Sequence, residues 1–182
     1  DGFVLGEGAG VMVLTTADLQ PALGPLLGWV GGYGLSSNAW RITDSPPDGR
    51  GAISAMEMAV DDAGVNLTDV VYINAHGTST AQNDASEATA IATLFDQKPP
   101  SVSSTKSSMG HLVAACGVVE AAITLRAISE RIAPFTRNLE RPDPDCPINH
   151  VMGRPRELES GVGLTNAFGF GGTNASVLLE AP

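Results

Sequence analysis

The sequence predicts a layered α/β fold in which a mixed sheet packs around a buried helix. Strand-like apolar runs and helical patterns follow one another in the order strand, helix, strand, helix, strand, helix, strand, strand. Residues 70–74 are continuously apolar over a strand length, which is typical of a parallel strand covered on both faces. Residues 112–130 are apolar on nearly every side up to Arg126, which predicts a helix buried all round.

Composition places the chain among globular proteins and excludes two classes of partner. The 182 residues are 43% hydrophobic and 16% charged, with a net charge of −10. No cluster of lysine and arginine is present, which argues against a nucleic-acid groove and against an anionic membrane surface. No apolar run is long enough to span a membrane. The chain opens on Asp1 inside a patterned segment without an initiator methionine, so we expect a fragment or a processed piece.

The glycine-rich start predicts a hairpin or strand pair. Residues 1–10 contain glycines at alternate positions and lead into the β-type run 11–14. A phosphate-binding glycine loop would need a helix directly after it, and none is predicted here. The glycines therefore indicate close backbone packing.

The remaining elements follow from apolar periodicity and from breaker residues. They are a short helical turn within 16–23, a strand over 26–35, a polar loop over 36–51, a helix over 52–63 ended by Gly64, the strand 70–74, a helix capped by Asp84 or Ser86, a weak strand over 101–104, the helix 112–130, a proline-rich traverse over 134–147, a short edge strand over 148–152, a strand starting at 161 and a closing strand over 175–180.

Two histidines stand in glycine-flanked loops after predicted strands. His76 follows the run that ends at Asn74, where α/β folds place ligands. His111 follows Gly110 at the predicted helix start, where the helix dipole disfavours imidazolium. Two neutral rings that donate N–H to one oxygen would stabilise developing negative charge. A single histidine would more simply be a polar loop residue, but the repeated context favours function. His150 lacks that context and is predicted to be structural or exposed.

Lys106 and Glu120 are predicted to form a pair. A carboxylate inside an apolar helix is costly unless it is paired or binds a cation. Lys106 precedes the helix by about one turn and can fold back toward Glu120. The alternative is that Glu120 faces solvent.

The loop around Phe170 has glycines that let backbone N–H groups point at a ligand, and a phenylalanine that can gate an apolar channel. Simple turn chemistry is the alternative. A nucleophile is harder to find. Cys116 lies within an apolar helix, where a buried thiol is normally inert, and Cys146 lies in a proline-rich loop. Neither has metal-ligand spacing, so reduced thiols of an intracellular protein are expected.

Four motifs then suggest a family. They are DGFVLGEGAG at 1–10, NAHGTST at 74–80, SSTKSSMGH at 103–111 and NAFGFGGTN at 166–174. In this order they resemble the motifs of β-ketoacyl acyl-carrier-protein synthases of the elongating type I and type II classes. The resemblance covers essentially the whole chain. It implies a thiolase-like fold, with residues 1–25 as the end of the N-terminal half (hairpin and connection) and residues 26–182 as the C-terminal half.

The resemblance also implies a reaction, a decarboxylative Claisen condensation in fatty-acid elongation. In that family a cysteine in the N-terminal half takes an acyl chain from acyl carrier protein. Malonyl-carrier protein loses carbon dioxide, and its carbanion attacks the thioester. His76 and His111 match the two catalytic histidines, Lys106 the active-site lysine, and Glu120 the buried glutamate that pairs with it. Because the nucleophilic cysteine is absent from this chain, we expect the chain alone to be inactive.

Further residues match by position. The N–H of Phe170 matches the oxyanion hole and its ring the gate of the acyl pocket. Thr78 and Thr80 match the threonines that bind phosphopantetheine, and Thr43 is expected to join them. A structural monovalent-cation site is implied at Asn74, Ala75, Glu120, Asn166 and Ala167.

Partners and alternatives follow from the same resemblance. No cofactor is required, since phosphopantetheine arrives on the acyl- or malonyl-loaded carrier protein, and a homodimer is expected for the full-length protein. The expected location is the cytoplasm in a bacterium, or the mitochondrion or plastid in a eukaryote. One alternative is a non-catalytic subunit similar to the chain-length factors of polyketide heterodimers. A thiolase or other enzyme of acyl-CoA is the second.

Overall fold

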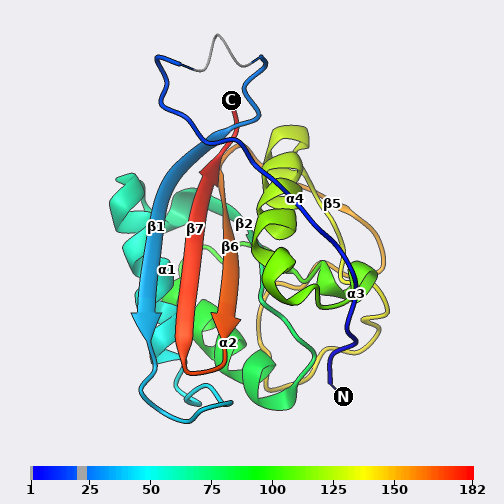
Figure 1. Ribbon diagram of the computed structural model, residues 1–182. Coiled ribbons are helices and arrows are strands. Elements are labelled where there is room, and N and C mark those ends of the chain that lie inside the picture. The colour runs from blue at the N-terminus through cyan, green and yellow to red at the C-terminus, as the bar shows by residue number, and fades with distance from the viewer. Residues whose placement is uncertain (1, 20–23) are drawn as a thin grey trace.

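The computed structural model describes residues 2–19 and 24–182 (Figure 1). A five-stranded mixed sheet has the strand order β1-β7-β6-β2-β3. Its strands are β1 (Trp29–Ser37), β2 (Val70–Asn74), β3 (Ser101–Ser103), β6 (Val162–Gly169) and β7 (Thr173–Glu180). β2 runs parallel to both β3 and β6, whereas β7 is antiparallel to β6 and to β1. The predicted mixed sheet and the buried parallel strand 70–74 are confirmed, since every residue of β2 is buried.

Helices cover the two faces of the sheet unequally. Helices α1 (Arg50–Ala63) and α2 (Ala81–Leu94) lie on one face, and α4 (Cys116–Glu130) lies on the other beside β6 and β2 (Figure 1). Gly32 and Gly34 let α1 approach β1 closely, because a Cβ on either would overlap a backbone carbonyl of α1. Gly64 ends α1 with a positive φ of 67°, as predicted.

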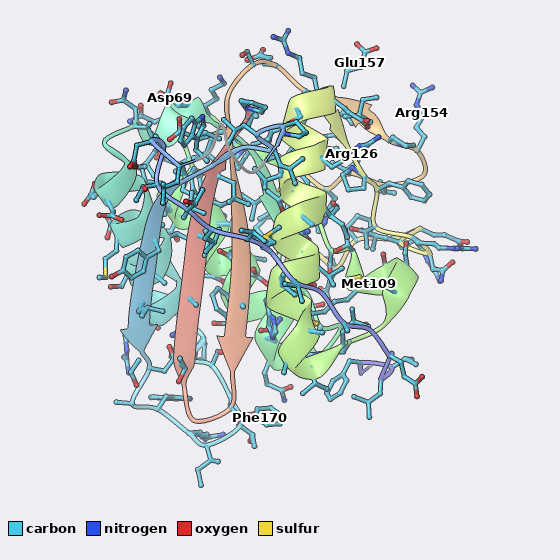
Figure 2. All side chains as sticks on the ribbon, turned by 45° about the horizontal axis from the view of Figure 1, so that its top comes forward. Asp69, Met109, Arg126, Arg154, Glu157 and Phe170 are labelled. Atoms are coloured by element: carbon cyan, nitrogen blue, oxygen red, sulfur yellow. The ribbon has the colours of Figure 1, made fainter. Side chains whose placement is uncertain are left out.

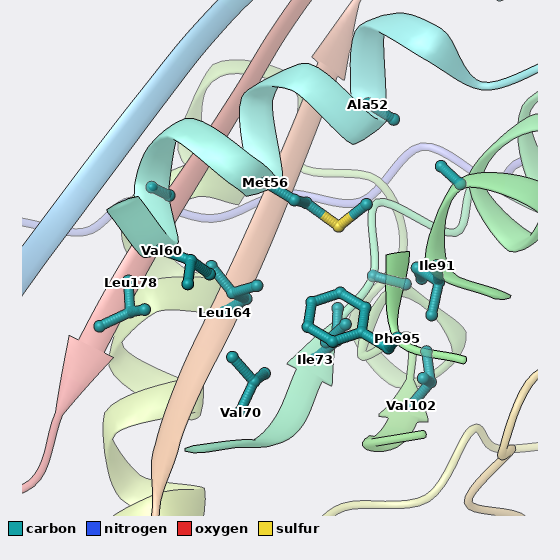
Figure 3. Close-up of a cluster of buried hydrophobic side chains, with 13 residues drawn as sticks. Ala52, Met56, Val60, Val70, Ile73, Ile91, Phe95, Val102, Leu164 and Leu178 are labelled. Carbon is teal, nitrogen blue, oxygen red and sulfur yellow. The ribbon is translucent and has the colours of Figure 1, made fainter. Parts of the chain in front are cut away.

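The core has one cluster on each face. Figure 3 shows the cluster under α1 and α2, in which Met56, Ile73, Ile91 and Leu164 are each at most 2% exposed. Burying a side chain of this size stabilises the fold by roughly 1.5–3 kcal/mol. The second cluster lies between the sheet and α4 and includes Tyr72, Ile128 and Leu179, among others. The two clusters together hold the strands whose ends carry the loops described below.

The predicted hairpin at the start of the chain is wrong. Residues 2–14 form no strand pair. They run as one extended segment that starts beside α3 (Lys106–Met109) and then crosses α4 (Figure 1). A strand needs a neighbouring strand with free N–H and C=O groups, and within residues 2–14 the only β-bridge is an isolated one between Leu5 and His111. The predicted close packing of the glycines is confirmed, because a Cβ on Gly6, Gly8 or Gly10 would overlap Met109, Leu112 or Val118.

The predicted helix over 112–130 also needs correction. A 3-10 turn at Val113–Ala115 precedes α4, which begins only at Cys116. Burial follows one face in steps of three and four residues and does not extend all round. The other sides of α4 are also largely apolar, but their side chains are only partly buried or exposed. Apolar composition alone therefore did not tell which sides of the helix are covered. Its buried positions are Cys116, Glu120, Thr124, Ala127 and Ile128.

Smaller boundaries shift for local reasons. Helix α2 begins at Ala81 after Thr80, so Asp84 lies inside the first turn and not at the cap. The predicted edge strand over 148–152 is replaced by isolated bridges from His150 and Met152. A two-stranded sheet of β4 (Ile132–Ala133) and β5 (Arg156–Glu157) was not predicted. Of the helical turn predicted within 16–23, residues 20–23 lie outside the described residues. Among the described residues, no helix is long and apolar enough to cross a membrane.

Candidate active site

The loops after β2 and β3 meet at the carboxyl edge of the parallel strands. The N–H of Ala75 donates to the carbonyl of Ser103 at 2.9 Å, and the Ser104 hydroxyl donates to the carbonyl of Gly77 at 2.8 Å. These bonds bring the rings of His76 and His111 to a centroid separation of 5.7 Å, nearly perpendicular at 88°. The carboxyl edge of parallel strands is where α/β folds bind ligands. The structure therefore brings the two predicted histidines together.

His76 is a buried, neutral imidazole. Its side chain lies against Phe168, with ring centroids 5.6 Å apart, and the residue is only 7% exposed. Burial lowers the pKa of His76 to about 3, and the charge of Lys106 and the nearby His111 act in the same direction. Its Nδ1 has no hydrogen-bond partner among the described residues. The ring is thus neutral at ordinary pH and keeps one nitrogen unpaired.

His111 is held in one tautomer by its own backbone turn. The N–H of Val113 donates to His111 Nδ1 at 3.0 Å, so the proton of the neutral ring must lie on Nε2. Val113 adopts a positive φ of 53°, an unfavourable conformation for a β-branched residue. Burial and the charge of Lys106 lower the pKa of His111. The sequence predicted that the dipole of the following helix would keep the ring of His111 neutral. That cause is wrong, because α4 starts five residues later, at Cys116.

Lys106 and Glu120 form the predicted buried pair. Lys106 Nζ lies 2.6 Å from Glu120 Oε1, and their side chains are 5% and 0% exposed. The alternative of a solvent-facing Glu120 is excluded. Burial raises the pKa of Glu120, and the Lys106 ammonium opposes that effect. The second oxygen, Oε2, is buried without a hydrogen-bond partner among the described residues.

Glu87 organises the His76 loop and was missed by the sequence analysis. Its Oε1 accepts from the backbone N–H of His76 at 2.9 Å and from Asn166 Nδ2 at 3.0 Å, and its Oε2 accepts from the N–H of Gly77 at 2.9 Å. Burial raises the pKa of Glu87, against the effect of these three donors. The signal was available, because Glu87 adjoins Ala88 and precedes Ile91 by four residues on the apolar face of α2.

The N-terminal segment 2–6 clips both histidine loops, which was also not predicted. The N–H of Gly2 donates to the carbonyl of Ser79 at 2.6 Å. The N–H of His111 donates to Val4 at 2.8 Å, and the N–H of Gly6 donates back to the His111 carbonyl at 3.0 Å. Phe3 packs on His111 with ring centroids 5.1 Å apart. No sequence signal indicates this contact, because it joins segments far apart in the chain.

The remaining predicted site residues lie around this centre at different depths. Thr78 and Thr80 share a hydrogen bond of 2.9 Å between their hydroxyls, in the His76 loop. Thr43 is exposed in the loop before α1. In the same loop the carbonyl of Ile42 accepts a hydrogen bond from the N–H of Gly171. Phe170 is 73% exposed. Figure 2 shows it beside the turn between β6 and β7. The ring against His76 is that of Phe168.

Cys116 contacts this centre, whereas His150 and Cys146 lie apart from it and contact each other. The Nε2 of His150 contacts the carbonyl of Cys146 at 2.9 Å, a structural role as predicted. Burial and neighbouring carboxylates raise the pKa of Cys146 to about 11. Cys116 differs, because its Sγ lies 3.4 Å from His111 Nδ1. Both thiols are uncharged at neutral pH, since burial also raises the pKa of Cys116.

The residues predicted to hold a monovalent cation fit such a site only in part. The unpaired Oε2 of Glu120 is a suitable ligand, because a buried carboxylate oxygen needs a donor or a cation. Asn166 uses its side chain elsewhere, donating to Glu87 and accepting from Ser176, and Asn74 Nδ2 donates to the Glu120 carbonyl at 3.3 Å. Backbone carbonyls of Ala75, Asn166 and Ala167 would have to supply the other ligands. In the described residues no group of three His, Cys, Asp or Glu side chains is placed to hold a metal.

Known sequences identify the family. Residues 27–140 match the family described as beta-ketoacyl synthase, C-terminal domain. The chain belongs to the β-ketoacyl synthase family. It is 44% identical over 183 residues to a 3-oxoacyl-acyl-carrier-protein synthase 2 of Synechocystis sp., covering 99% of this chain and 44% of the relative. A protein with the same description from Rhizobium meliloti is 47% identical over 183 residues, with 99% and 43% covered. The chain thus spans less than half the length of these curated relatives.

Solved structures show that the fold is the thiolase-like fold of ketosynthases. A structure described as the ishigamide ketosynthase/chain length factor superposes with a TM-score of 0.93 at 34% identity, over 100% of this chain and 45% of that one. A type II polyketide ketosynthase in complex with its acyl-carrier protein superposes with a TM-score of 0.92 at 30% identity, over 100% and 45%. The fold predicted from the sequence is confirmed, as is the expectation that the chain corresponds to the C-terminal part of this family.

Proposed function

We propose that the protein containing this chain catalyses the decarboxylative condensation of malonyl-carrier protein with an enzyme-bound acyl thioester. The observation that carries the proposal is the pair of neutral imidazoles, His76 and His111, whose rings lie 5.7 Å apart at the carboxyl edge of β2 and β3. Neutral imidazoles donate N–H without carrying a charge of their own, which suits an oxygen that gains negative charge during the reaction. The synthase names of its relatives support the same reaction.

The proposed reaction has two steps, decarboxylation and condensation, and the two histidines act in the first. The bond between the malonyl α-carbon and its carboxylate breaks, carbon dioxide leaves, and the electron pair moves into an enolate. N–H groups of His76 and His111 stabilise the enolate oxygen. The α-carbon then attacks the acyl thioester carbonyl, a carbon–carbon bond forms, and the carbon–sulfur bond breaks to release the enzyme thiolate. The ammonium of Lys106, which is paired with Glu120, helps to keep both imidazoles neutral, because burial and this charge together lower the pKa of each ring.

Other residues have supporting roles in this proposal. Thr78 and Thr80 hydrogen-bond the phosphopantetheine arm, with Thr43 at its outer end. The N–H of Phe170 stabilises the oxyanion of the acyl thioester, and its exposed ring closes the acyl pocket. A monovalent cation held by Glu120 and neighbouring carbonyls would be structural, neutralising the second carboxylate oxygen.

The nucleophilic thiol comes from outside this chain in our proposal. Both cysteines here are buried or partly buried, and burial raises the pKa of each thiol. A thiolate nucleophile needs the opposite environment. We therefore expect residues 1–182 alone to be inactive. From the resemblance to the family we further expect the complete protein to work as a homodimer with acyl carrier protein, in the cytoplasm of a bacterium or in the mitochondrion or plastid of a eukaryote.

The test uses the full-length gene product and malonyl-carrier protein. His76→Ala and His111→Ala should each reduce the release of carbon dioxide by about 10²–10⁴-fold, because each removes one of two cooperating donors. His150→Ala is the matched control and should leave the rate unchanged, since the His150 imidazole bonds the backbone carbonyl of Cys146 away from the two catalytic candidates. Decarboxylation that survives in both His76→Ala and His111→Ala would overturn the proposal.

A non-catalytic subunit is the second candidate, because one structural relative is described as a ketosynthase/chain length factor. The assembled histidines and the Lys106–Glu120 pair favour the enzyme, since a subunit without chemistry has no need of all of them. The two functions separate by acyl transfer. The enzyme, incubated alone with acyl-carrier protein, should form an acyl-thioester on one of its own cysteines, whereas the subunit should not.

A further inference from the structure

Cys116 touches the candidate catalytic centre without a role in the proposed reaction. It is the first residue of α4 and only 4% exposed. Its Sγ lies 3.4 Å from His111 Nδ1 and 3.1 Å from the backbone N of Leu112. Both distances are within the range for hydrogen bonds to sulfur. The thiol thus lies between the start of the helix and the imidazole.

Two backbone donors determine the direction of these bonds. The N–H of Leu112 can only donate, so it occupies a lone pair of Sγ. The N–H of Val113 can only donate, so His111 Nδ1 is an acceptor without a hydrogen. The thiol hydrogen is then the group that faces the imidazole. Burial raises the pKa of Cys116, so the thiol retains that hydrogen at neutral pH.

We propose that Cys116 is a positioning residue for His111, donating its S–H to Nδ1 so that the ring keeps its proton on Nε2. The importance of this bond for catalysis rests on the proposed function, in which Nε2–H is the donor. A hydrogen on Nδ1 would point at the Val113 N–H, which can only donate, and it would displace the thiol hydrogen, so the S–H bond to Nδ1 would be lost. The thiol therefore disfavours both the other neutral tautomer and the imidazolium.

The strain at Val113 explains why a second donor matters. A left-handed conformation is strained for a β-branched L-residue, and Val113 is 64% exposed, so little packing holds it in place. Cys116 is attached to a full helix. It lies four residues before Glu120 on the buried face of α4, the face that also fixes Lys106. One helix face thus positions both the lysine and the histidine.

The test measures the imidazole directly in the full-length protein. Histidine is labelled with ¹⁵N, and the His111 signals are assigned with a His111→Gln variant. In the native protein the nitrogen shifts should show a neutral ring protonated on Nε2. Cys116→Ala should raise the population of other protonation forms at a given pH by about threefold, because one weak hydrogen bond is lost. Cys116→Val is a second apolar variant in case the alanine variant does not fold.

Two further variants make the result specific. Cys116→Ser keeps a donor and an acceptor at the same place and should restore the native tautomer. Cys146→Ala removes the other cysteine, which has no contact with His111, and should change nothing. The proposal is overturned if Cys116→Ala and Cys116→Val leave the His111 shifts and titration as they are in Cys146→Ala, or if Cys116→Ser behaves like Cys116→Ala. The spectra need no substrate, so they separate this outcome from a failure of the proposed condensing activity.

Discussion

Both histidine loops contact segment 2–6, but they differ at the imidazole: the Glu87 carboxylate holds the backbone of the His76 loop and leaves Nδ1 of that ring without a partner among the described residues, whereas two groups contact Nδ1 of His111. Beneath His76, the Glu87 carboxylate accepts the N–H groups of residues 76 and 77, and the ring itself keeps a free Nδ1. His111 instead has its Nδ1 occupied by Val113 and Cys116, and its backbone is paired with segment 2–6. The His76 ring therefore has a fixed place but an Nδ1 that remains available to a ligand. The contacts on Nδ1 of His111 instead hold that ring in the tautomer that donates from Nε2.

The largest effect is expected from breaking the buried Lys106–Glu120 ion pair, which lies beside the His111 loop. Lys106→Met leaves the Glu120 carboxylate buried without its partner, which should lower the free energy of unfolding by about 3–5 kcal/mol. The double variant Lys106→Met/Glu120→Leu removes both charges and should recover most of the loss. Urea unfolding of the full-length protein measures both. A loss in the single variant no greater than in the double variant would show that the pair is not a buried support.

Removal of Glu87 should break the His76 loop nearly as strongly. Glu87→Ala leaves the N–H groups of His76 and Gly77 buried without an acceptor, and should cost about 2–4 kcal/mol. Glu87→Gln keeps one oxygen acceptor and should cost less. Gln82→Ala, at an exposed position of the same helix, is the control and should stay within about 0.5 kcal/mol of the native protein. Equal losses in the Ala and Gln variants would contradict the role of the carboxylate.

The two loops should also differ in how they respond to acid. The pKa of His76 is lowered in the folded state to about 3, from 6.5 when unfolded, so below pH 6.5 the unfolded chain binds a proton that the folded chain does not. Its contribution to stability is therefore complete above pH 6.5 and is lost as pH falls toward 3, on the order of a few kcal/mol. His76→Asn should flatten this slope in urea unfolding measured at a series of pH values. An unchanged slope would place the acid sensitivity elsewhere, and His150→Asn is the control.

The smallest effect tests the clip by the N-terminal segment. A Cβ at Gly6 would overlap the Met109 carbonyl, so Gly6→Ala should cost about 1–3 kcal/mol by overpacking or should release the segment. Gly117→Ala, in α4 with open space around it, should instead stabilise by about 0.5–1 kcal/mol. Urea unfolding distinguishes the two. If Gly6→Ala were as harmless as Gly117→Ala, His111 would not depend on this segment.

Much of the fold could be predicted because its signals are local. The apolar run 70–74 predicts a buried parallel strand, and Gly64 ends α1 through a conformation that glycine adopts at little cost. The prediction failed for residues 2–14, where β-type residues have no strand beside them, because pairing depends on a neighbour and not on propensity. It also failed for the far side of α4, where apolar side chains are not all covered.

The candidate site divides in the same way. Lys106 and Glu120 could be paired from the sequence, because an isolated carboxylate in an apolar helix requires a partner nearby. Glu87 was missed although it satisfies the same criterion, since the short polar residues around it make α2 look amphipathic. The hydrogen bonds of segment 2–6 with the two histidine loops carry no signal in the sequence, because each of them joins backbone groups that any residue possesses.

By itself, the sequence determined the α/β fold class, the family and the residues able to do chemistry, because periodicity, turn residues and motifs are written in short stretches of chain. Only the tertiary structure decided which of these residues meet. The parallel pairing of β2 with β3 brings His76 to His111, and the register of α4 brings Cys116 and Glu120 under the same loop. Distances between such remote segments depend on how the layers pack, and therefore on all of the residues that fill the two cores.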